Sequence, residues 1–214
     1  MLTIAPRPEG RLRHDVGTLR PSHDCVNEEP SVLRRAPRTR GLGHYARAVR
    51  TRLVEARDAA QVASIYNAEV AEPAVTFELV PRSLDEQRSW IERHRGAHPA
   101  LVAVDDEPGD GARVLGFASL SAFRDRPAYA TSVEDSVYVD RAARGRGVGG
   151  RLLTDLLTAA RDNGFHAVFA RIVDRNEASI RLHTSCGFEL VGVEREAGRK
   201  HGRWLDVVEL QCLL

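Results

Sequence analysis

The chain has 214 residues and a mass of 23.6 kDa, and its 43% hydrophobic and 29% charged residues are ordinary values for one globular domain with an additional segment. Its formal net charge of +1 makes nucleic acid an unlikely partner, and no apolar run approaches the ~18 residues that a membrane-spanning helix needs. Three scattered cysteines exclude a disulfide scaffold, and the histidines show no metal-ligand spacing, so we expect no metal.

Residues 1–50 differ in composition from the rest of the chain. They hold ten Arg, five acidic residues and five of the ten Pro, for a net charge of +5, whereas the other 164 residues carry −4. No period of 2 or 3.6 is sustained there, which predicts a disordered extension before a single domain at residues 51–214. The extension lacks the apolar core of a secretory signal, so we expect a cytoplasmic protein that does not contact membranes.

Hydrophobic periodicity and capping residues predict alternating strands and helices in residues 51–214. The first half reads as a strand at 52–57, a helix opened by a capping box of Asp58 and Gln61, a helix from Ser83 to about Arg95, and a hairpin of strands at 100–104 and 114–123. The second half reads as a strand at 131–139, a helix ended by Gly164, a strand at 167–173, a helix at 177–186, and strands at 190–193 and 204–213. This order predicts an α/β fold with a mixed (α+β) sheet, helices on both faces and one parallel crossover around the helix ended by Gly164.

The segment RGRGVGG at residues 144–150 lies between an expected strand and an expected amphipathic helix. Glycines allow successive backbone N–H groups to face one ligand, and the helix N-terminus adds positive potential. The segment therefore predicts a phosphate-binding loop made of Arg144, Gly145, Arg146, Gly147, Val148, Gly149 and Gly150, with the two arginines adding charge.

Two other phosphate-binding motifs fit this segment less well. The sequence has no nucleotide-triphosphatase P-loop. Gly145, Gly147 and Gly150 fit the dinucleotide fingerprint, with Asp174 further along the chain. A five-residue segment, 141–145, separates the strand from Arg146, and no repeated βα units precede it, so a nicotinamide-dependent reductase is the less favoured alternative.

Several ordered motifs resemble one enzyme family. Arg144-x-x-Gly147-x-Gly149 resembles the acetyl-CoA pyrophosphate loop of the GNAT N-acetyltransferases, and Asn176-x-x-Ser179 followed by CGF at 186–188 resembles the next stretch of that fold. Within the superfamily, SVEDSVYV at 132–139, RLH at 181–183 and GRKHGRWLD at 198–206 are similar to the phosphinothricin and methionine sulfoximine acetyltransferases. The resemblance covers about residues 52–214.

The resemblance implies a GNAT acyl-CoA N-acyltransferase fold in which two parallel central strands splay apart and acetyl-CoA binds between them as co-substrate. It implies that the pantetheine arm pairs with the main chain near Val137, Tyr138 and Val139, that the pyrophosphate meets the amides of residues 145–150, and that Asn176 faces the cofactor. It also implies a homodimer and a small-molecule amine as substrate.

Candidate catalytic residues follow from what acetyl transfer to an amine requires. Glu134 lies mid-strand between apolar residues, where a carboxylate is costly unless used, so we expect it to be the general base; a solvated carboxylate is the alternative. The resemblance places His183 where many members have a tyrosine acid, and an imidazole donates a proton near neutral pH; a structural histidine is the alternative. Direct transfer is favoured over a Cys186 nucleophile, because that residue precedes a helix-ending glycine where small buried residues are common.

The acceptor is expected to be a small amino acid or analogue with an anionic side group, of the phosphinothricin or methionine sulfoximine type. Arg124 and Arg126 precede the Glu134 strand and would pair with that anion, and Phe77 would wall the pocket. A charged surface loop and a core phenylalanine are the alternatives. A different class of function, an acetyl-CoA-binding sensor with a basic arm, is also compatible with the motifs.

Overall fold

The computed structural model describes residues 49–105, 112–173 and 176–214. The predicted extension lies outside the described residues except for Val49 and Arg50, which belong to the first strand, and Asp174 lies outside them as well.

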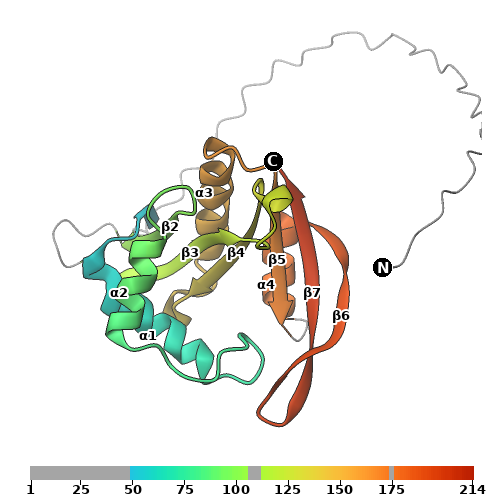
Figure 1. The fold of residues 1–214 in the computed structure, drawn as a ribbon. Coiled ribbons are helices and arrows are strands. Elements are labelled where there is room, and N and C mark those ends of the chain that lie inside the picture. Colours follow the sequence, from blue (N-terminus) through green and yellow to red (C-terminus); the bar gives the residue numbers. More distant parts are fainter. Residues whose placement is uncertain (1–48, 106–111, 174–175) are drawn as a thin grey trace, which may run out of the picture. The chain divides into compact units, whose positions relative to one another are not determined.

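In the described residues, seven strands form one sheet in the order β1-β2-β3-β4-β5-β7-β6 (Figure 1). The strands are β1 Val49–Leu53, β2 Ala100–Asp105, β3 Val114–Ala122, β4 Ser132–Val139, β5 Ala167–Val173, β6 Glu189–Lys200 and β7 Arg203–Leu213. The helices are α1 Ala59–Val70, α2 Leu84–Arg93, α3 Val148–Asp162 and α4 Glu177–Ser185, with short 3-10 turns at Ala56–Asp58, Pro127–Tyr129 and Arg141–Ala143.

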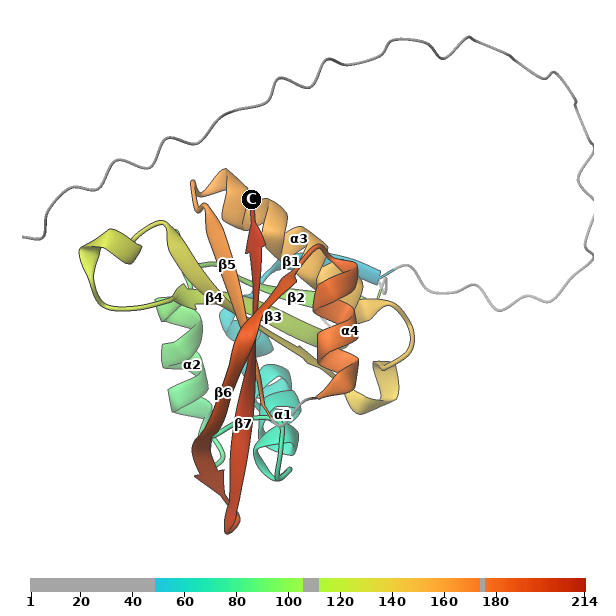
Figure 2. The ribbon, with the colours of Figure 1, turned by 90° about the vertical axis from the view of Figure 1, so that its right-hand side faces the viewer.

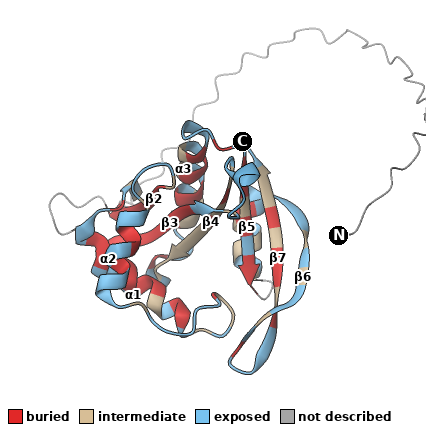
Figure 3. Ribbon diagram, viewed as in Figure 1, coloured by how far each residue is buried: buried red, intermediate tan, exposed pale blue. Residues whose placement is uncertain are grey.

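The sheet is mixed, as predicted, because β4 and β5 are parallel while the other neighbours are antiparallel. Helices α1 and α2 cover one face and α3 and α4 the other (Figures 1 and 2). Each face buries its own apolar cluster: Val62, Ile65 and Ile91 belong to the cluster under α1 and α2, and Leu152 and Leu156 to the one under α3 (Figure 3). The predicted fold class is confirmed, and β6 and β7 extend as a long hairpin past the other strands (Figure 2).

The parallel pair β4·β5 separates soon after it forms. Pairing stops at Glu134↔Phe169, although β4 continues to Val139 and β5 to Val173. On its other side β4 pairs with β3 over its whole length without a register shift, so its side chains alternate strictly between the two faces. Glu134, Ser136 and Tyr138 therefore share one face, as expected for an unbroken strand, and the fold opens a gap beside them.

The start of the domain differs from the sequence prediction. The strand lies at Val49–Leu53 rather than at 52–57, and the Asp58 side chain accepts no capping hydrogen bond from the backbone of α1. The Asp58 carboxylate instead accepts hydrogen bonds at 2.7 and 2.8 Å from the Arg52 guanidinium and at 2.8 Å from the Glu55 backbone N–H. Gln61 accepts a hydrogen bond from the Val114 backbone at 2.9 Å. Asp58 thus belongs to a capping box with Glu55, one turn earlier than predicted, and pairs with Arg52 instead of capping α1.

The last hairpin is also longer than predicted. Strand β6 runs over twelve residues, Glu189–Lys200, with register shifts between Leu190 and Gly192 and between Glu194 and Gly198. Strand β6 is one of the two edge strands of the sheet and is mostly exposed, so its polar sequence lacks the apolar alternation on which the prediction of residues 190–193 relied.

Other local signals are confirmed. The Ser83 side chain accepts a hydrogen bond from the Glu86 backbone at 3.2 Å while the Glu86 carboxylate accepts one from the Ser83 backbone at 2.7 Å, which is the predicted capping box. Gly164 and Gly187 follow α3 and α4 at φ of +78° and +92°, where glycine avoids the strain of a β-carbon.

Candidate active site

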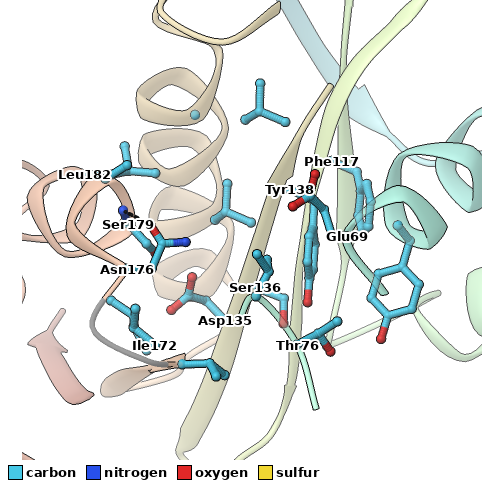
Figure 4. A pocket seen from close by; sticks show the side chains of 18 of the residues that line it. Glu69, Thr76, Phe117, Asp135, Ser136, Tyr138, Ile172, Asn176, Ser179 and Leu182 are labelled. Atoms are coloured by element: carbon cyan, nitrogen blue, oxygen red, sulfur yellow. Dashed lines mark hydrogen bonds between the residues drawn. The ribbon is translucent and has the colours of Figure 1, made fainter. Parts of the chain in front are cut away.

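A pocket of about 840 Å³ lies where β4 and β5 separate. Its walls come from β4, β5, the start of α3, α4 and residues 75–82 (Figure 4). It brings together most of the predicted site residues: Phe77, Glu134, Val137, Tyr138, Val139, Arg144, Gly145, Gly147, Val148, Gly149, Gly150, Asn176 and His183. The lining does not include Arg146, Arg124 or Arg126.

Residues 144–150, here called the glycine loop, have the geometry of an anion site. Gly145 and Gly147 adopt φ of +74° and +79°, and Gly147 is the N-cap of α3. The first turn of α3 has no acidic residue, so its free N–H groups and positive helix end face the pocket uncompensated. A β-carbon on Gly149 would lie 3.1 Å from the Leu182 side chain, so glycine also permits close packing of α3 on α4. The loop is therefore suited to a phosphate group.

The arginines of the glycine loop are arranged differently from the prediction. Arg144 donates a hydrogen bond at 2.7 Å to the buried carboxylate of Glu69 on α1, which also accepts one at 3.2 Å from Arg141. The charge of Arg144 is thus largely neutralised within the protein, and it holds the loop against α1. Because Arg146 does not line the pocket, the positive potential that the loop turns toward it comes chiefly from the backbone.

Glu134 lies at the point where β4 and β5 part. Its side chain is half-buried, and this burial raises the pKa of its carboxyl above the ordinary value. Arg171 acts in the opposite direction, while the nearby acidic groups Asp135, Glu209 and Glu194 add to the rise. A carboxylate whose proton affinity is increased is better suited to accept a proton from an amine.

Asp135 and His183 form a buried ion pair on the opposite side of β4. His183 Nε2 lies 3.0 Å from Asp135 Oδ2, and His183 Nδ1 lies 2.7 Å from the Ser179 carbonyl. Burial lowers the pKa of His183, but the hydrogen bond and charge of Asp135 outweigh it and raise the pKa above the usual value. Because a carbonyl and a carboxylate both only accept, His183 is an imidazolium with both N–H groups engaged.

One atom of this pair has no partner. Asp135 Oδ1 is buried and has no hydrogen-bond partner among the described residues, although Asp135 lines the pocket. Figure 4 shows Asp135 and Tyr138 extending from opposite sides of β4. The sequence analysis missed Asp135; strand alternation alone would have placed this carboxylate on the same face as Val133, where burial requires a partner.

Asn176 caps α4 beside this pair. Its side-chain oxygen accepts a hydrogen bond at 3.2 Å from the Ser179 backbone, and it lines the pocket, as Figure 4 shows. The residue thus orients the first turn of α4, which carries Ser179 and His183.

Aromatic rings form the side of the pocket under α1 and α2. Tyr138 lies edge-on to Tyr66 at 5.2 Å between ring centroids and stacks on Phe117 at 5.1 Å. Burial raises the pKa of the Tyr138 phenol, which therefore stays protonated. The Arg82 guanidinium lies 3.9 Å from the Tyr66 ring centroid. The sequence analysis named neither Tyr66 nor Arg82 as a residue of the site.

Residues 75–82, here called the acceptor wall, are held by residues from distant parts of the chain. Lys200 Nζ, on a side chain that is only 1% exposed, donates hydrogen bonds at 2.8 Å to the carbonyls of Val70 and Thr76. Phe77 is partly exposed and packs against Gly198 of β6, where a β-carbon would lie 2.3 Å from the ring. Phe77 therefore walls the pocket, with the β6–β7 hairpin behind it.

Arg124 and Arg126 lie on the surface between β3 and β4. The Arg124 guanidinium lies 4.7 Å from the Phe123 ring centroid. Neither arginine lines the pocket described above.

The described residues contain no group of three or more His, Cys, Asp or Glu side chains arranged to hold a metal ion. In the same part of the chain, no helix combines the length and the apolar character that crossing a membrane requires.

Comparison with known proteins gives a consistent result. A family profile described as "Acetyltransferase (GNAT) domain" matches residues 51–208. A phosphinothricin N-acetyltransferase of Streptomyces coelicolor is 42% identical over 152 residues, which are 70% of this chain and 87% of that protein. An L-methionine sulfoximine/L-methionine sulfone acetyltransferase of Pseudomonas paraeruginosa is 38% identical over 154 residues, which are 72% of this chain and 87% of that protein.

The fold comparison agrees. The crystal structure of a GNAT superfamily phosphinothricin acetyltransferase from Sinorhizobium meliloti in complex with acetyl-CoA superposes with a TM-score of 0.72. It is 37% identical and covers 78% of this chain and 88% of its own.

Proposed function

The chain belongs to the GNAT acetyltransferase family, and from this premise we propose that it transfers the acetyl group of acetyl-CoA to the amine of a small amino acid or analogue of the phosphinothricin or methionine sulfoximine type. The observation that supports this most is the pocket in which the glycine loop and Glu134 lie on the walls of one cavity at the β4·β5 separation.

The residues present fit acetyl-CoA. The glycine loop offers backbone N–H groups without a nearby acidic residue in α3, which suits the pyrophosphate. Beyond Glu134 the strand β4 has no partner on the β5 side, so the main-chain groups of Val137 and Val139 are available to the pantetheine amides. The main chain of Tyr138, between them, faces β3 and is paired with Phe117. Acetyl-CoA supplies an acetyl group activated as a thioester.

Glu134 is proposed as the general base. The acceptor amine arrives as an ammonium ion, and Glu134 removes a proton directly or through water so that the neutral nitrogen attacks the thioester carbonyl. A backbone N–H near Val137 would stabilise the negative charge that develops on the carbonyl oxygen. Transfer is direct: the new C–N bond forms as the C–S bond breaks, and no covalent bond to the enzyme is needed.

The ion pair of His183 and Asp135 is proposed to supply the proton that the departing thiolate takes up. The raised pKa of His183 keeps a proton in the pair at neutral pH. Delivery requires one of its two N–H bonds to be redirected, because the Ser179 carbonyl and Asp135 hold both in the resting protein. A purely structural role of His183 in anchoring α4 to β4 is the competing interpretation.

The test is a free-thiol assay with acetyl-CoA and a panel of amino acids and analogues, followed across pH. Glu134→Gln should lower turnover by about 10²- to 10⁴-fold and leave acetyl-CoA affinity nearly unchanged. In the parent enzyme, activity should fall as pH drops through the pKa of Glu134, which lies above the ordinary glutamate value, and this acid limb should vanish in the variant. Ser121→Ala, at an exposed hydroxyl facing the Glu134 carbonyl, is the matched control on β3.

The outcomes separate the alternatives. Unchanged turnover in Glu134→Gln would remove this residue from the role of base. A basic limb that disappears in His183→Gln supports proton supply, whereas equal losses at every pH favour a structural histidine. Acetyl-CoA binding without thiol release on any amine would instead favour the sensor. The homodimer and the cytoplasmic location remain predictions, the first of which sedimentation equilibrium would test.

A further inference from the structure

The cationic side chains that line the pocket differ in whether a carboxylate neutralises them. Arg144 pairs with Glu69 at 2.7 Å, Arg171 pairs with Glu194 at 2.5 Å, and His183 pairs with Asp135 at 3.0 Å. Arg82 also lines the pocket, but no carboxylate lies within ion-pair distance of it in the described part of the chain. Arg82 thus lines the pocket without a direct carboxylate partner among those residues; it lies against the Tyr66 ring, and its charge acts on the Glu86 carboxyl from further away.

Arg82 is fixed in place from two directions. Its backbone N–H donates to the side-chain oxygen of Asn67 at 2.8 Å, and its carbonyl accepts from the Asn67 side-chain nitrogen at 2.9 Å. Its guanidinium lies over the Tyr66 ring at 3.9 Å and near Trp90 at 5.9 Å. Stacking on the rings leaves the edge of the guanidinium, with its N–H donors, for a ligand.

Arg82 lies on the side of the pocket where the acceptor, rather than the cofactor, would bind. Tyr66 contacts Tyr138, and Tyr138 shares the face of β4 that carries Glu134. The glycine loop reaches the pocket from α3, on the opposite face of the sheet from α1 and α2. An amine held near Glu134 would therefore extend its other groups along the aromatic side toward Arg82.

We propose that Arg82 binds the anionic group of the acceptor, a carboxylate or a phosphinate, through the edge of its guanidinium. A guanidinium offers paired donors that match two oxygen atoms of such a group. A bound anion would give Arg82 the negatively charged partner that Arg144, Arg171 and His183 already have. This inference rests on the proposed function, since it names the residue that selects an acidic acceptor at the same site.

The experiment compares acceptors that differ in charge. Binding to the CoA-loaded protein is measured by titration calorimetry for three compounds: methionine sulfone, whose one anion is its carboxylate; its carboxamide, which keeps the amine but has no anion; and phosphinothricin, which adds a phosphinate. Arg82→Gln should weaken binding of methionine sulfone about 10- to 100-fold and leave the carboxamide unchanged. Arg82→Lys should recover part of the loss, because lysine keeps the charge without the paired geometry.

Two matched controls accompany these variants. Arg88→Gln removes an exposed arginine of α2 that pairs with Asp85, and it should change neither affinity. The double variant Arg124→Gln/Arg126→Gln removes the arginines that sequence reasoning favoured, and it should leave the preference for the acid over the carboxamide in place.

The results decide between clear alternatives. A loss confined to phosphinothricin would identify the phosphinate as the group that Arg82 holds. Equal weakening of acid and carboxamide in Arg82→Gln, or loss of the acid preference only in the Arg124/Arg126 double variant, would overturn the proposal. A parent protein that binds acids through Arg82 but acetylates none of them would contradict the proposed function while leaving this inference intact.

Discussion

The glycine loop and the acceptor wall line the same pocket but are shaped by different kinds of contact. The glycine loop owes its form to its own backbone, through two positive φ angles and the start of α3. The acceptor wall depends on Lys200, whose hydrogen bonds reach carbonyls 130 and 124 positions away in the sequence. A loop shaped by its own backbone can be encoded locally, whereas a wall held by hydrogen bonds from a distant lysine takes shape only when separate segments of the chain come together.

Lys200→Met should give the largest effect and would break the acceptor wall. It leaves the carbonyls of Val70 and Thr76 buried without their donor, which costs about 2–5 kcal/mol of stability on typical values for unsatisfied groups. Chemical denaturation would measure the loss. Arg199→Met is the matched control: this neighbour is exposed over Trp204 and should change stability by less than ~0.5 kcal/mol. Equal losses in both variants would show that the hairpin, rather than these hydrogen bonds, is responsible.

Gly198→Ala should have the second-largest effect. It would show whether the acceptor side of the pocket can be damaged without affecting the acetyl-CoA side. The added methyl group would lie 2.3 Å from the Phe77 ring, which must move. On the usual ~1–3 kcal/mol for overpacking, KM for the acceptor should rise by about 5- to 150-fold while KM for acetyl-CoA stays close to its original value. Gly192→Ala on the same strand has open space around it and should behave like the parent enzyme. A rise in both KM values would mean that the two sides are coupled.

Gly147→Ala should have the smallest effect. It changes the glycine loop and leaves the acceptor wall as it is. Nothing lies within 4 Å of the new methyl group, so the cost is the backbone strain at φ +79°, about 1–2 kcal/mol. Acetyl-CoA binding, measured by calorimetry, should weaken by about 5- to 30-fold, with acceptor KM unchanged. Gly164→Ala has nearly the same φ, +78°, at the other end of α3, so it should share any loss of stability but not the loss of affinity.

Most of the helices and strands could be predicted because the residues that begin, end and orient them are close together in the sequence. The Ser83 capping box, the amphipathic face of α3 and the glycines after α3 and α4 each act within a few residues. The prediction failed at Asp58 because two nearby residues compete for its carboxylate: Glu55 forms a capping box with it one turn earlier, and Arg52 pairs with it. It failed in β6 because pairing with β7 extends an exposed edge strand whose own sequence shows no apolar alternation.

The sequence by itself determined the order of elements, the mixed sheet with its parallel crossover, the glycine loop and the mid-strand position of Glu134. Only the tertiary structure decided where β4 and β5 part, which partner each charged group has, and which arginine faces the pocket. Arg82 and Arg124 look alike in the sequence, as arginines beside turns. The difference between them is set by long-range packing, because the charge that a side chain leaves available depends on neighbours that only the folded chain brings together.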